Sequence, residues 1–249
     1  MKSFLFVTDL DNTLVGESRA LAVLNEKLKQ HREEHGTKIV YATGRSPILF
    51  QELCNEKLLL EPDALVASVG TEIYFKNSDT ADQGWEDKLS PHWNRDAILA
   101  TTAHFADLVM QPDSEQRPFK VSFLLTENLA QEVLPQLKSQ LEQQGLDTKL
   151  IYSAGIDLDI LPRHGDKGLA VQYLRSLWGI EAKQTVVCGD SGNDISLFSQ
   201  AEERGIIVGN AKSELLQWHN NNPANYHYLA QAFCAGGILE GLNHFGFIE

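Results

Sequence analysis

The feature that most constrains the fold of this chain is a short apolar run, residues 4–7, which leads directly into Thr8 and Asp9, with Asp11 two residues further on. Because consecutive positions of the run are apolar, the pattern predicts a strand at residues 5–7 that is buried on both faces. Such strands are typical of parallel sheets covered by helices on each side. Asp9 and Asp11 would then follow the carboxyl end of a strand, where α/β proteins bind ligands.

Strand and helix patterns alternate through the first and last parts of the chain. We expect strands at residues 5–7, 38–42, 64–68, 185–188 and 205–208, and helices at residues 20–34, from Pro47 onward with Ser46 as N-cap, and at 167–178 and 236–244. Residues 219–228 have a low helical propensity and are expected to form a loop. This order predicts an α/β protein with a doubly wound, Rossmann-like parallel-sheet core and right-handed crossovers.

The middle of the chain has a different pattern, which predicts an inserted α+β domain at residues 86–161 within a core made of residues 1–85 and 162–249. The expected elements are a helix from Ser90-Pro91 to near Leu108, a polar loop at 111–118, a strand at 119–125, a helix from Pro135 to Gln144, and strands at 149–153 and 156–162.

Charge and cysteine content exclude several kinds of partner. The formal net charge is -13 over 249 residues, and a broad acidic surface repels nucleic acid and anionic membranes, so neither is expected. Cys54, Cys188 and Cys234 are too widely spaced for a zinc site or a disulfide framework, which favours reduced thiols in a cytoplasmic protein. Asp9 interrupts the first apolar run, so we expect no secretory signal there. No later apolar run is long enough to span a bilayer.

Polar residues recur where the predicted strands end or helices begin. They are Thr43, Gly44 and Arg45 after the second strand, Lys167 at a helix start, and Asp190, Ser191, Asn193 and Asp194 after the strand that ends at Cys188. By themselves, Asp9 and Asp11 are as well explained by turn and N-cap chemistry. The convergence of the other residues favours function, because Asp9 and Asp190 together would make an oxygen-rich site suited to Mg²⁺.

Phosphoryl transfer to a carboxylate is the reaction that needs this set of residues. Asp9 would attack phosphorus and form an aspartyl-phosphate. Mg²⁺ and Lys167 would offset the negative charge, and Thr43, the Gly44 amide and helix N-termini would stabilise the remainder. Asp11 would protonate the leaving alkoxide and then take a proton from the attacking water.

Four segments, DLDNT at 9–13, ATGR at 42–45, DKG at 166–168 and GDSGND at 189–194, resemble the ordered motifs of the haloacid-dehalogenase superfamily of phosphatases. The resemblance implies Asp9 as nucleophile, Asp11 as general acid and base, Thr43 as phosphate ligand and Lys167 as charge anchor. It also implies a Mg²⁺ site formed by Asp9, the Asp11 backbone carbonyl, Asp190 and Asp194, with Asn193 supporting it. The insertion resembles the α+β cap of that superfamily, which covers the substrate.

Three further segments, YATGRS at 41–46, VGTEIYF at 69–75 and RPFKVSF at 117–123, are similar to those of sucrose-6-phosphate phosphatases. This resemblance implies hydrolysis of sucrose-6-phosphate to sucrose and phosphate, the last step of sucrose synthesis. The residues then expected to contact the substrate are Thr43, Gly44, Arg45, Gly70, Thr71, Glu72, Lys120, Asp159, Arg163, Lys167 and Asn193.

Several of these residues have simpler structural interpretations. Glu72 could pair across a hairpin, Lys120 could be the exposed member of an alternating strand, and Arg163 could be a solvated loop charge. Trp85 and Trp93 could stack on a sugar, but aromatic residues at a domain junction more often serve packing.

Other functions stay open on the sequence. A capped phosphatase of mannosyl-3-phosphoglycerate or trehalose-6-phosphate would share every core residue. A receiver protein that keeps phosphate on an aspartate would also combine acidic residues, Mg²⁺, a threonine and a lysine, although the placement of Asp11 and the insertion disfavour it. The expected partner is a small sugar phosphate; a complex with sucrose-phosphate synthase is an alternative that no residue indicates.

Overall fold

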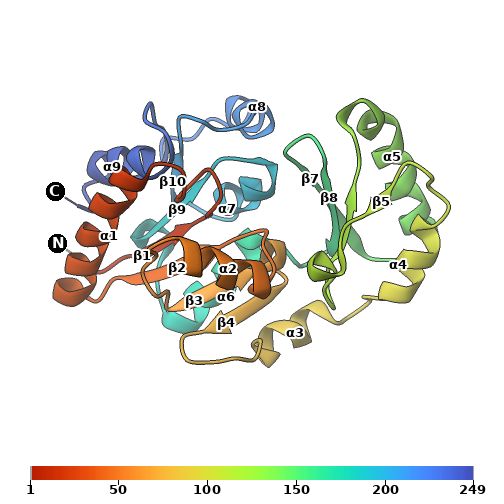
Figure 1. Cartoon of the computed structure of the whole chain (residues 1–249), viewed down its shortest axis with the longest axis horizontal. Helices are drawn as coiled ribbons and strands as arrows, with labels where there is room; N and C mark the ends of the chain where they lie inside the picture. The colour runs from red at the N-terminus through yellow and green to blue at the C-terminus, as the bar shows by residue number, and fades with distance from the viewer. Residues whose placement is uncertain (1, 249) are drawn as a thin grey trace.

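The computed structural model describes residues 2–248 and contains two β-sheets (Figure 1). The larger sheet has the strand order β11-β10-β9-β1-β2-β3-β4, and its neighbouring strands are parallel except for the antiparallel pair β3 and β4. Its strands are β1 Leu5–Thr8, β2 Lys38–Ala42, β3 Ala64–Ala67, β4 Glu72–Phe75, β9 Thr185–Gly189, β10 Arg204–Ile207 and β11 His227–Leu229. The strand β1 is central, so its carboxyl end lies between those of β9 and β2.

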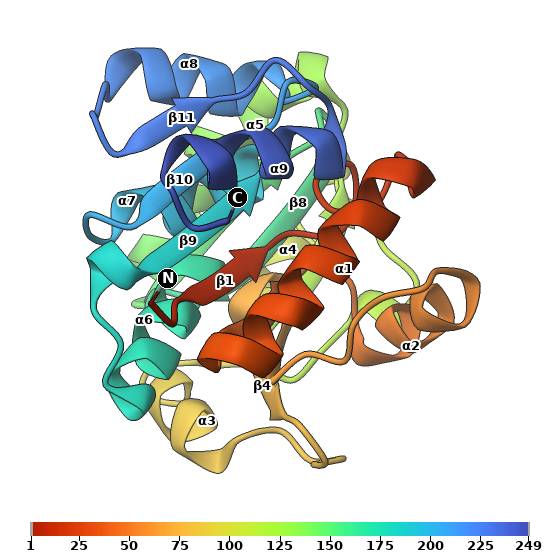
Figure 2. The ribbon, with the colours of Figure 1, turned by 90° about the vertical axis from the view of Figure 1, so that its left-hand side faces the viewer.

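Helices cover both faces of the larger sheet. They are α1 Ser18–His35, α2 Pro47–Glu56, α3 Gln83–Leu89, α6 Lys167–Trp178, α7 Ile195–Ser199, α8 Ser213–Asn221 and α9 Cys234–His244. Helices α1 and α9 lie side by side over one face (Figure 2), where Phe6 packs among their apolar residues. Leu5 and Val7 point to the other face and pack with α6 and α7. All three side chains are fully buried, which confirms that β1 is buried on both faces.

The smaller sheet, with the order β5-β6-β8-β7, is antiparallel throughout. Its strands and helices are α4 Arg95–Thr102, β5 Val109–Met110, β6 Val121–Leu124, α5 Glu127–Gln143, β7 Thr148–Ser153 and β8 Asp157–Pro162. We call this unit the cap, and the larger sheet with its helices the core; the cap forms the right-hand part of Figure 1. The boundary expected at residue 86 falls within α3, and that expected at residue 161 falls within β8.

The helix expected between Ser90 and Leu108 is shorter than predicted. Helix α4 begins at Arg95, where the Asn94 side chain accepts a hydrogen bond of 3.0 Å from the Ala97 amide. It ends at Thr102. The Asn94 cap satisfies an amide at the helix start that has no partner within the helix, so it fixes the first turn here rather than at Pro91.

The prediction that a helix begins at Pro135 is wrong, because this proline lies inside α5. Proline removes one backbone hydrogen bond and crowds the preceding turn. Four buried side chains at helical spacing, Ala130, Val133, Leu137 and Leu141, pack in the apolar cluster of the cap. Their burial outweighs the cost of the proline and extends the helix back to Glu127.

The loop expected at residues 219–228 is also partly wrong. Helix α8 continues to Asn221, and His227–Leu229 forms the edge strand β11, which pairs in parallel with β10. The sequence pattern of this segment is weak because the strand has only three residues and its hydrogen-bonding partner comes from elsewhere in the chain. No helix among residues 2–248 is long and apolar enough to cross a membrane.

Candidate active site

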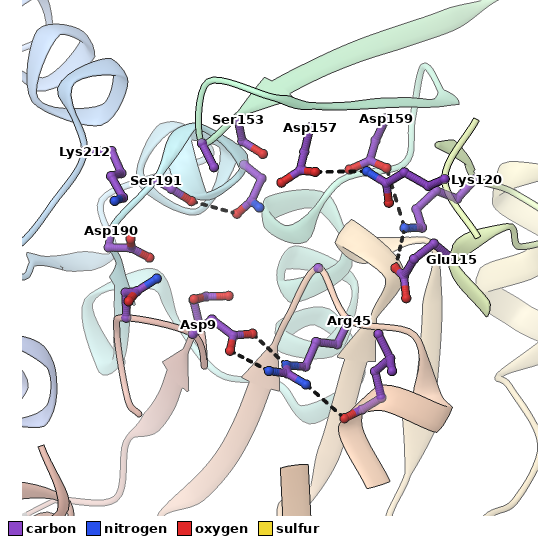
Figure 3. A pocket seen from close by; sticks show the side chains of 17 residues that line it. Asp9, Arg45, Glu115, Lys120, Ser153, Asp157, Asp159, Asp190, Ser191 and Lys212 are labelled. Carbon is purple, nitrogen blue, oxygen red and sulfur yellow. Dashed lines mark hydrogen bonds and ion pairs between the residues drawn. The ribbon is translucent and has the colours of Figure 1, made fainter. Parts of the chain in front are cut away.

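The carboxyl ends of three adjacent core strands bring polar residues to one edge of the sheet. Asp190 follows β9, Asp9 follows β1 and Thr43 follows β2, while Lys167 is the first residue of α6. A cavity of about 290 Å³ lies beside this edge, between the core and the cap (Figure 3). It is lined by Asp9, Asp11, Asn12, Gly44, Arg45, Leu49, Asp190, Ser191, Asn193 and Lys212 from the core, and by Gln111, Glu115, Lys120, Ser153, Ala154, Asp157 and Asp159 from the cap.

The Lys167 ammonium group holds the acidic residues of the core together. Its Nζ donates to Asp9 Oδ1 at 2.7 Å, to Asp194 Oδ1 at 2.7 Å and to Asn193 Oδ1 at 2.8 Å, and the side chain is fully buried. Burial alone lowers the pKa of a lysine, but the carboxylates of Asp194 and Asp9 outweigh it and raise the pKa of Lys167. The group therefore stays positively charged beside Asp9.

Asp194 binds Lys167 and also organises the loop after β9. Its second oxygen, Oδ2, accepts hydrogen bonds of 3.0 Å from the backbone amides of Asp190 and Ser191. A Cβ atom at position 189 would lie 2.5 Å from the Asp194 Cβ atom, so the close approach of this loop requires Gly189. Both oxygens of Asp194 thus have donors within the protein, so this side chain holds Lys167 and the loop in position, and its expected role as a metal ligand stays a prediction.

The acidic cluster offers a set of oxygen ligands for a divalent cation. Asp9, Asp190 and Asp194 each place a carboxylate oxygen within 4.8 Å of the others. Thr13 Oγ1 donates to Asp190 Oδ1 at 2.9 Å. Burial and the charge of Asp194 raise the pKa of Asp190 to about 7, and burial raises the pKa of Asp9 despite Lys167. The cluster therefore has more buried negative charge than Lys167 neutralises, which fits a hard dication.

Asp11 lies at the cavity edge and is held by Arg45. The Arg45 Nε and Nη2 atoms donate to Asp11 Oδ2 at 2.7 Å and Oδ1 at 2.8 Å, a bidentate ion pair. The Asp11 side chain is 47% exposed, and both residues line the cavity. The structure thus brings Arg45 to the site, with its guanidinium group engaged by the carboxylate expected to act as acid and base.

Thr43 and Gly44 form the turn after β2. The Thr43 hydroxyl accepts a hydrogen bond of 3.1 Å from the Arg45 amide, and its side chain is buried. Gly44 lines the cavity, where its missing side chain leaves the backbone open to a ligand. Asn193 is also at the cavity and contacts Lys167.

Lys120 and Asp159 line the cap side of the cavity. Lys120 is only 2% exposed, and its Nζ lies 3.2 Å from Glu115 Oε2 and 3.5 Å from Asp159 Oδ1. Asp159 also accepts a hydrogen bond of 2.6 Å from Ser122. The interpretation of Lys120 as the exposed member of an alternating strand is therefore wrong. In Figure 3 these cap residues lie across the cavity from Asp9 and Asp190.

Six residues expected to contact substrate do not line this cavity. Two of them, Thr43 and Lys167, are buried directly beside the lining residues Gly44 and Asp9. The other four are engaged elsewhere. Glu72 is buried and bonded to Arg117, Tyr74 and Ser68. The Thr71 hydroxyl donates to the Ser68 carbonyl, and Gly70, at φ +97°, packs against the Asp166 backbone. Arg163 pairs with Asp147 on the exposed surface of the cap. The side chains of Glu72, Thr71 and Arg163 are each bonded to a protein group outside the cavity. Gly70 is kept outside it by its close packing against the Asp166 backbone.

The two tryptophans considered for sugar stacking also lie outside the cavity lining. The Trp85 Nε1 atom donates to the Gly70 carbonyl at 3.0 Å, and the Trp93 Nε1 atom donates to the Pro118 carbonyl at 2.8 Å. Each ring nitrogen is therefore committed to a protein carbonyl.

Several lining residues were not found from the sequence, notably Gln111, Glu115, Asp157 and Lys212. Asp157 and Asp159 are two apart on β8, so they share a face of the strand; this spacing could have identified Asp157. Gln111 and Glu115 come from a polar loop without periodicity. Lys212 reaches the site because its amide donates to the Asp190 carbonyl at 2.7 Å, a contact that the sequence pattern does not reveal.

Comparisons with known proteins agree on one family. The model of the family described as sucrose-6F-phosphate phosphohydrolase matches residues 2–246. A probable sucrose-phosphatase 2 of Arabidopsis thaliana is 43% identical over 97% of this chain and 59% of its own length. The chain therefore spans less than two thirds of that plant relative. Mannosylfructose-phosphate phosphatase of Agrobacterium fabrum is 31% identical over 97% of this chain and 96% of its own length.

Solved structures show the same relationship. The sucrose-phosphatase of Synechocystis sp. PCC6803, in complex with sucrose and phosphate, is 43% identical, with a TM-score of 0.93 over 99% of both chains. A haloacid-dehalogenase-superfamily phosphatase of Bacteroides thetaiotaomicron is 18% identical with a TM-score of 0.73 over 99% of this chain and 96% of its own, and it shows the shared fold alone. The chain belongs to the sucrose-6F-phosphate phosphohydrolase family of the haloacid-dehalogenase superfamily.

Proposed function

We propose that this protein is a Mg²⁺-dependent phosphatase that hydrolyses sucrose-6-phosphate to sucrose and phosphate, the last step of sucrose synthesis. The observation that carries the proposal is the Asp9–Lys167 pair on one side of a cavity whose opposite side is lined by polar cap residues. The Synechocystis relative, solved with sucrose and phosphate, supports the choice of substrate. The three free cysteines favour a reducing compartment, and we place the reaction in the cytoplasm.

The reaction that we propose has two steps on Asp9. A carboxylate oxygen of Asp9 attacks phosphorus, the bond from phosphorus to the sugar oxygen breaks, and Asp11 gives that oxygen a proton. Water then attacks the phosphoryl group, Asp11 takes a proton from that water, and the bond from phosphorus to Asp9 breaks, which releases phosphate and restores both carboxyl groups. The contact of Lys167 with Asp9 Oδ1 orients the nucleophile.

The core residues around Asp9 supply the electrostatic stabilisation. Lys167 remains charged, and Gly44 lines the cavity with its backbone amide where the phosphate oxygens would lie. Asp11 has to exchange at least one of its contacts with Arg45 for the leaving oxygen. Its partial exposure in this structure leaves it room to do so.

Asp9, Asp190 and the backbone carbonyl of Asp11 are the groups that we propose to hold Mg²⁺. When bound, the cation would offset the charge of the phosphate and of the attacking carboxylate. Asp194 supports the site through Lys167 and the backbone amides after β9. Burial, together with the neighbouring carboxylates, raises the pKa values of Asp9 and Asp190, and a bound dication would offset the negative charge that this cluster carries when it is ionised.

The cap side of the cavity suits the hydroxyl groups of a disaccharide. Lys120 can donate, Asp157 and Asp159 can accept, and the Gln111 amide, which donates to Asp157 at 2.9 Å, can do both. The cavity volume of about 290 Å³ is close to the lower bound of roughly 300 Å³ for small-molecule sites. The phosphate would point to the core and the sugar to the cap.

A second candidate substrate is another disaccharide phosphate. The Agrobacterium relative acts on mannosylfructose phosphate, according to its name, and it shares nearly the full length of this chain at 31% identity. Trehalose-6-phosphate and mannosyl-3-phosphoglycerate would use the same core residues. A receiver protein fits poorly, because residues of the cap line the same cavity as Asp9, and because Asp11, which we propose as the residue that activates water, lines that cavity too.

Substrate preference is the first test. Phosphate release in the presence of Mg²⁺ should be fastest by at least about tenfold in kcat/KM with sucrose-6-phosphate, compared with mannosylfructose phosphate, trehalose-6-phosphate, mannosyl-3-phosphoglycerate and glucose-6-phosphate. A clear preference for another disaccharide phosphate would reassign the substrate. Equal rates on all five would overturn the role of the cap in selection.

The metal requirement is tested by chelation. Protein treated with EDTA should lose activity and recover it on addition of Mg²⁺, while Asp190→Asn should raise the Mg²⁺ concentration for half-maximal activity by at least about tenfold. Asp147→Asn, which removes a surface carboxylate of the cap, is the matched control. Full activity in EDTA, or an equal effect of both variants, would contradict the assignment.

Asp9→Asn tests the nucleophile. The amide cannot form the aspartyl-phosphate, so turnover should fall by more than about 10³-fold. Binding of sucrose-6-phosphate, measured by calorimetry, should persist because the cavity shape and the cap contacts are unchanged. Retained turnover would show that another group attacks phosphorus.

Lys120→Ala tests sugar recognition. Removing this buried donor should raise KM for sucrose-6-phosphate by roughly tenfold or more, and change KM for phenyl phosphate little, because only the disaccharide reaches the cap. Lys138→Ala removes a lysine from the exposed surface of α5 and should leave both KM values as they are. Equal increases for both substrates would place Lys120 outside sugar recognition.

A further inference from the structure

An ion pair between the core and the cap lies outside the cavity. The Arg117 Nε and Nη2 atoms donate to Glu72 Oε1 at 2.6 Å and to Glu72 Oε2 at 3.0 Å. Glu72 is the first residue of β4 in the core, and Arg117 lies in the cap segment that precedes β6. Neither residue lines the cavity, so this contact needs a role other than direct contact with substrate.

The environment of Glu72 fixes this pair in place. Its side chain is 3% exposed and also accepts hydrogen bonds from Tyr74 at 2.5 Å and Ser68 at 3.2 Å. Burial raises the pKa of Glu72, but the contacts with Arg117 and Tyr74 outweigh it and lower the pKa. Glu72 is therefore a charged, fully bonded anchor, and a buried charge of this kind depends on its partner.

Arg117 transmits this anchoring to the cavity through its backbone. Its amide donates to the Lys120 carbonyl at 3.0 Å, and the Lys120 amide donates to the Arg117 carbonyl at 3.2 Å, so residues 117–120 form a closed turn. Arg95 adds a hydrogen bond of 3.3 Å to the Arg117 carbonyl. The Lys120 side chain points into the cavity and contacts Glu115, which flanks the same turn.

We propose that Glu72 and Arg117 are positioning residues for sugar selection, which fix the turn at residues 117–120 so that Lys120 and Glu115 meet the disaccharide. This inference rests on the proposed function. Glu72 belongs to the core, which also carries the phosphate site. The turn at residues 117–120 is therefore held in position relative to the phosphate site and not only relative to the rest of the cap. The distance between the phosphate site and Lys120 is thereby set by an ion pair whose two residues lie outside the cavity lining.

The cap contains a second ion pair with the core that serves as an internal comparison. Lys149 of β7 pairs with Asp166, the N-cap of α6. Lys149 also joins the cap to the core, but none of the described backbone hydrogen bonds links it to the turn at residues 117–120. A variant at Lys149 therefore shows the effect of losing any ion pair between core and cap, and a variant at Glu72 shows the effect of losing this particular anchor.

Selectivity measured on variants tests the proposal. Glu72→Gln and Arg117→Met should each raise KM for sucrose-6-phosphate and lower its kcat/KM relative to phenyl phosphate by roughly 10- to 100-fold, because small misplacements of contacts have effects of this size. Values for phenyl phosphate should change little. Arg117→Lys, which keeps one charged donor, should restore part of the selectivity, and the double variant should be no worse than the poorer single variant.

The controls separate this role from simple support of the fold. Lys149→Gln should leave the ratio of the two kcat/KM values unchanged. Thermal unfolding reports whether a variant is folded, and Glu72→Gln, which keeps the side-chain shape, gives a readout if Arg117→Met is destabilised. Equal losses on both substrates, additive effects in the double variant, or the same loss of ratio in Lys149→Gln would overturn the proposal.

The unmodified protein distinguishes the two levels of inference. If it shows no preference for sucrose-6-phosphate over phenyl phosphate, the proposed function fails, and the positioning role fails with it. If it shows the preference and Glu72→Gln retains it in full, the positioning role alone is overturned.

Discussion

The arrangement of the candidate active site depends on the buried ammonium group of Lys167. It is fully buried between Asp9, Asn193 and Asp194, which come from the end of β1 and from the loop after β9. A buried charge is tolerated only when it is paired and hydrogen-bonded, and the removal of one partner leaves the others uncompensated. The contacts of Lys167 that would orient the nucleophile therefore also join three parts of the core. These parts are the end of β1, the loop after β9 and the start of α6.

The charges that line the cavity bear on how an acidic protein could bind the sugar phosphate that we propose as substrate. The chain has a net charge of -13, yet Arg45, Lys120 and Lys212 line the cavity, and Lys167 lies directly behind Asp9. Arg45 and Lys120 are each paired with carboxylates. The same lining contains more carboxylates than cations, so an anionic substrate would depend on Lys167 and on the dication that we propose at Asp9 and Asp190. The lining carboxylates are Asp9, Asp11, Glu115, Asp157, Asp159 and Asp190.

The fold and the core of the site were predictable for a local reason. Burial of β1 on both faces follows from consecutive apolar residues, and the positions of Asp9, Thr43, Lys167 and Asp190 follow from where strands end and helices begin. The errors in the predicted helices and strands arise from contacts between residues that are distant in the sequence. Pro135 lies within α5 because packing in the cap outweighs a local preference, and β11 exists because β10 provides its hydrogen-bonding partner.

The alternation of strands and helices, and the residues that meet at the carboxyl edge of the core, follow from the amino-acid sequence alone because both depend on short-range periodicity. The partners of individual side chains follow only from the folded chain. Glu72 turns to Arg117, 45 residues away in the chain, instead of to the cavity, and Asp11 is held by Arg45, 34 residues away. Such pairings depend on distances and burial in the folded chain. A charged side chain pairs with the group of opposite charge that the fold brings close to it.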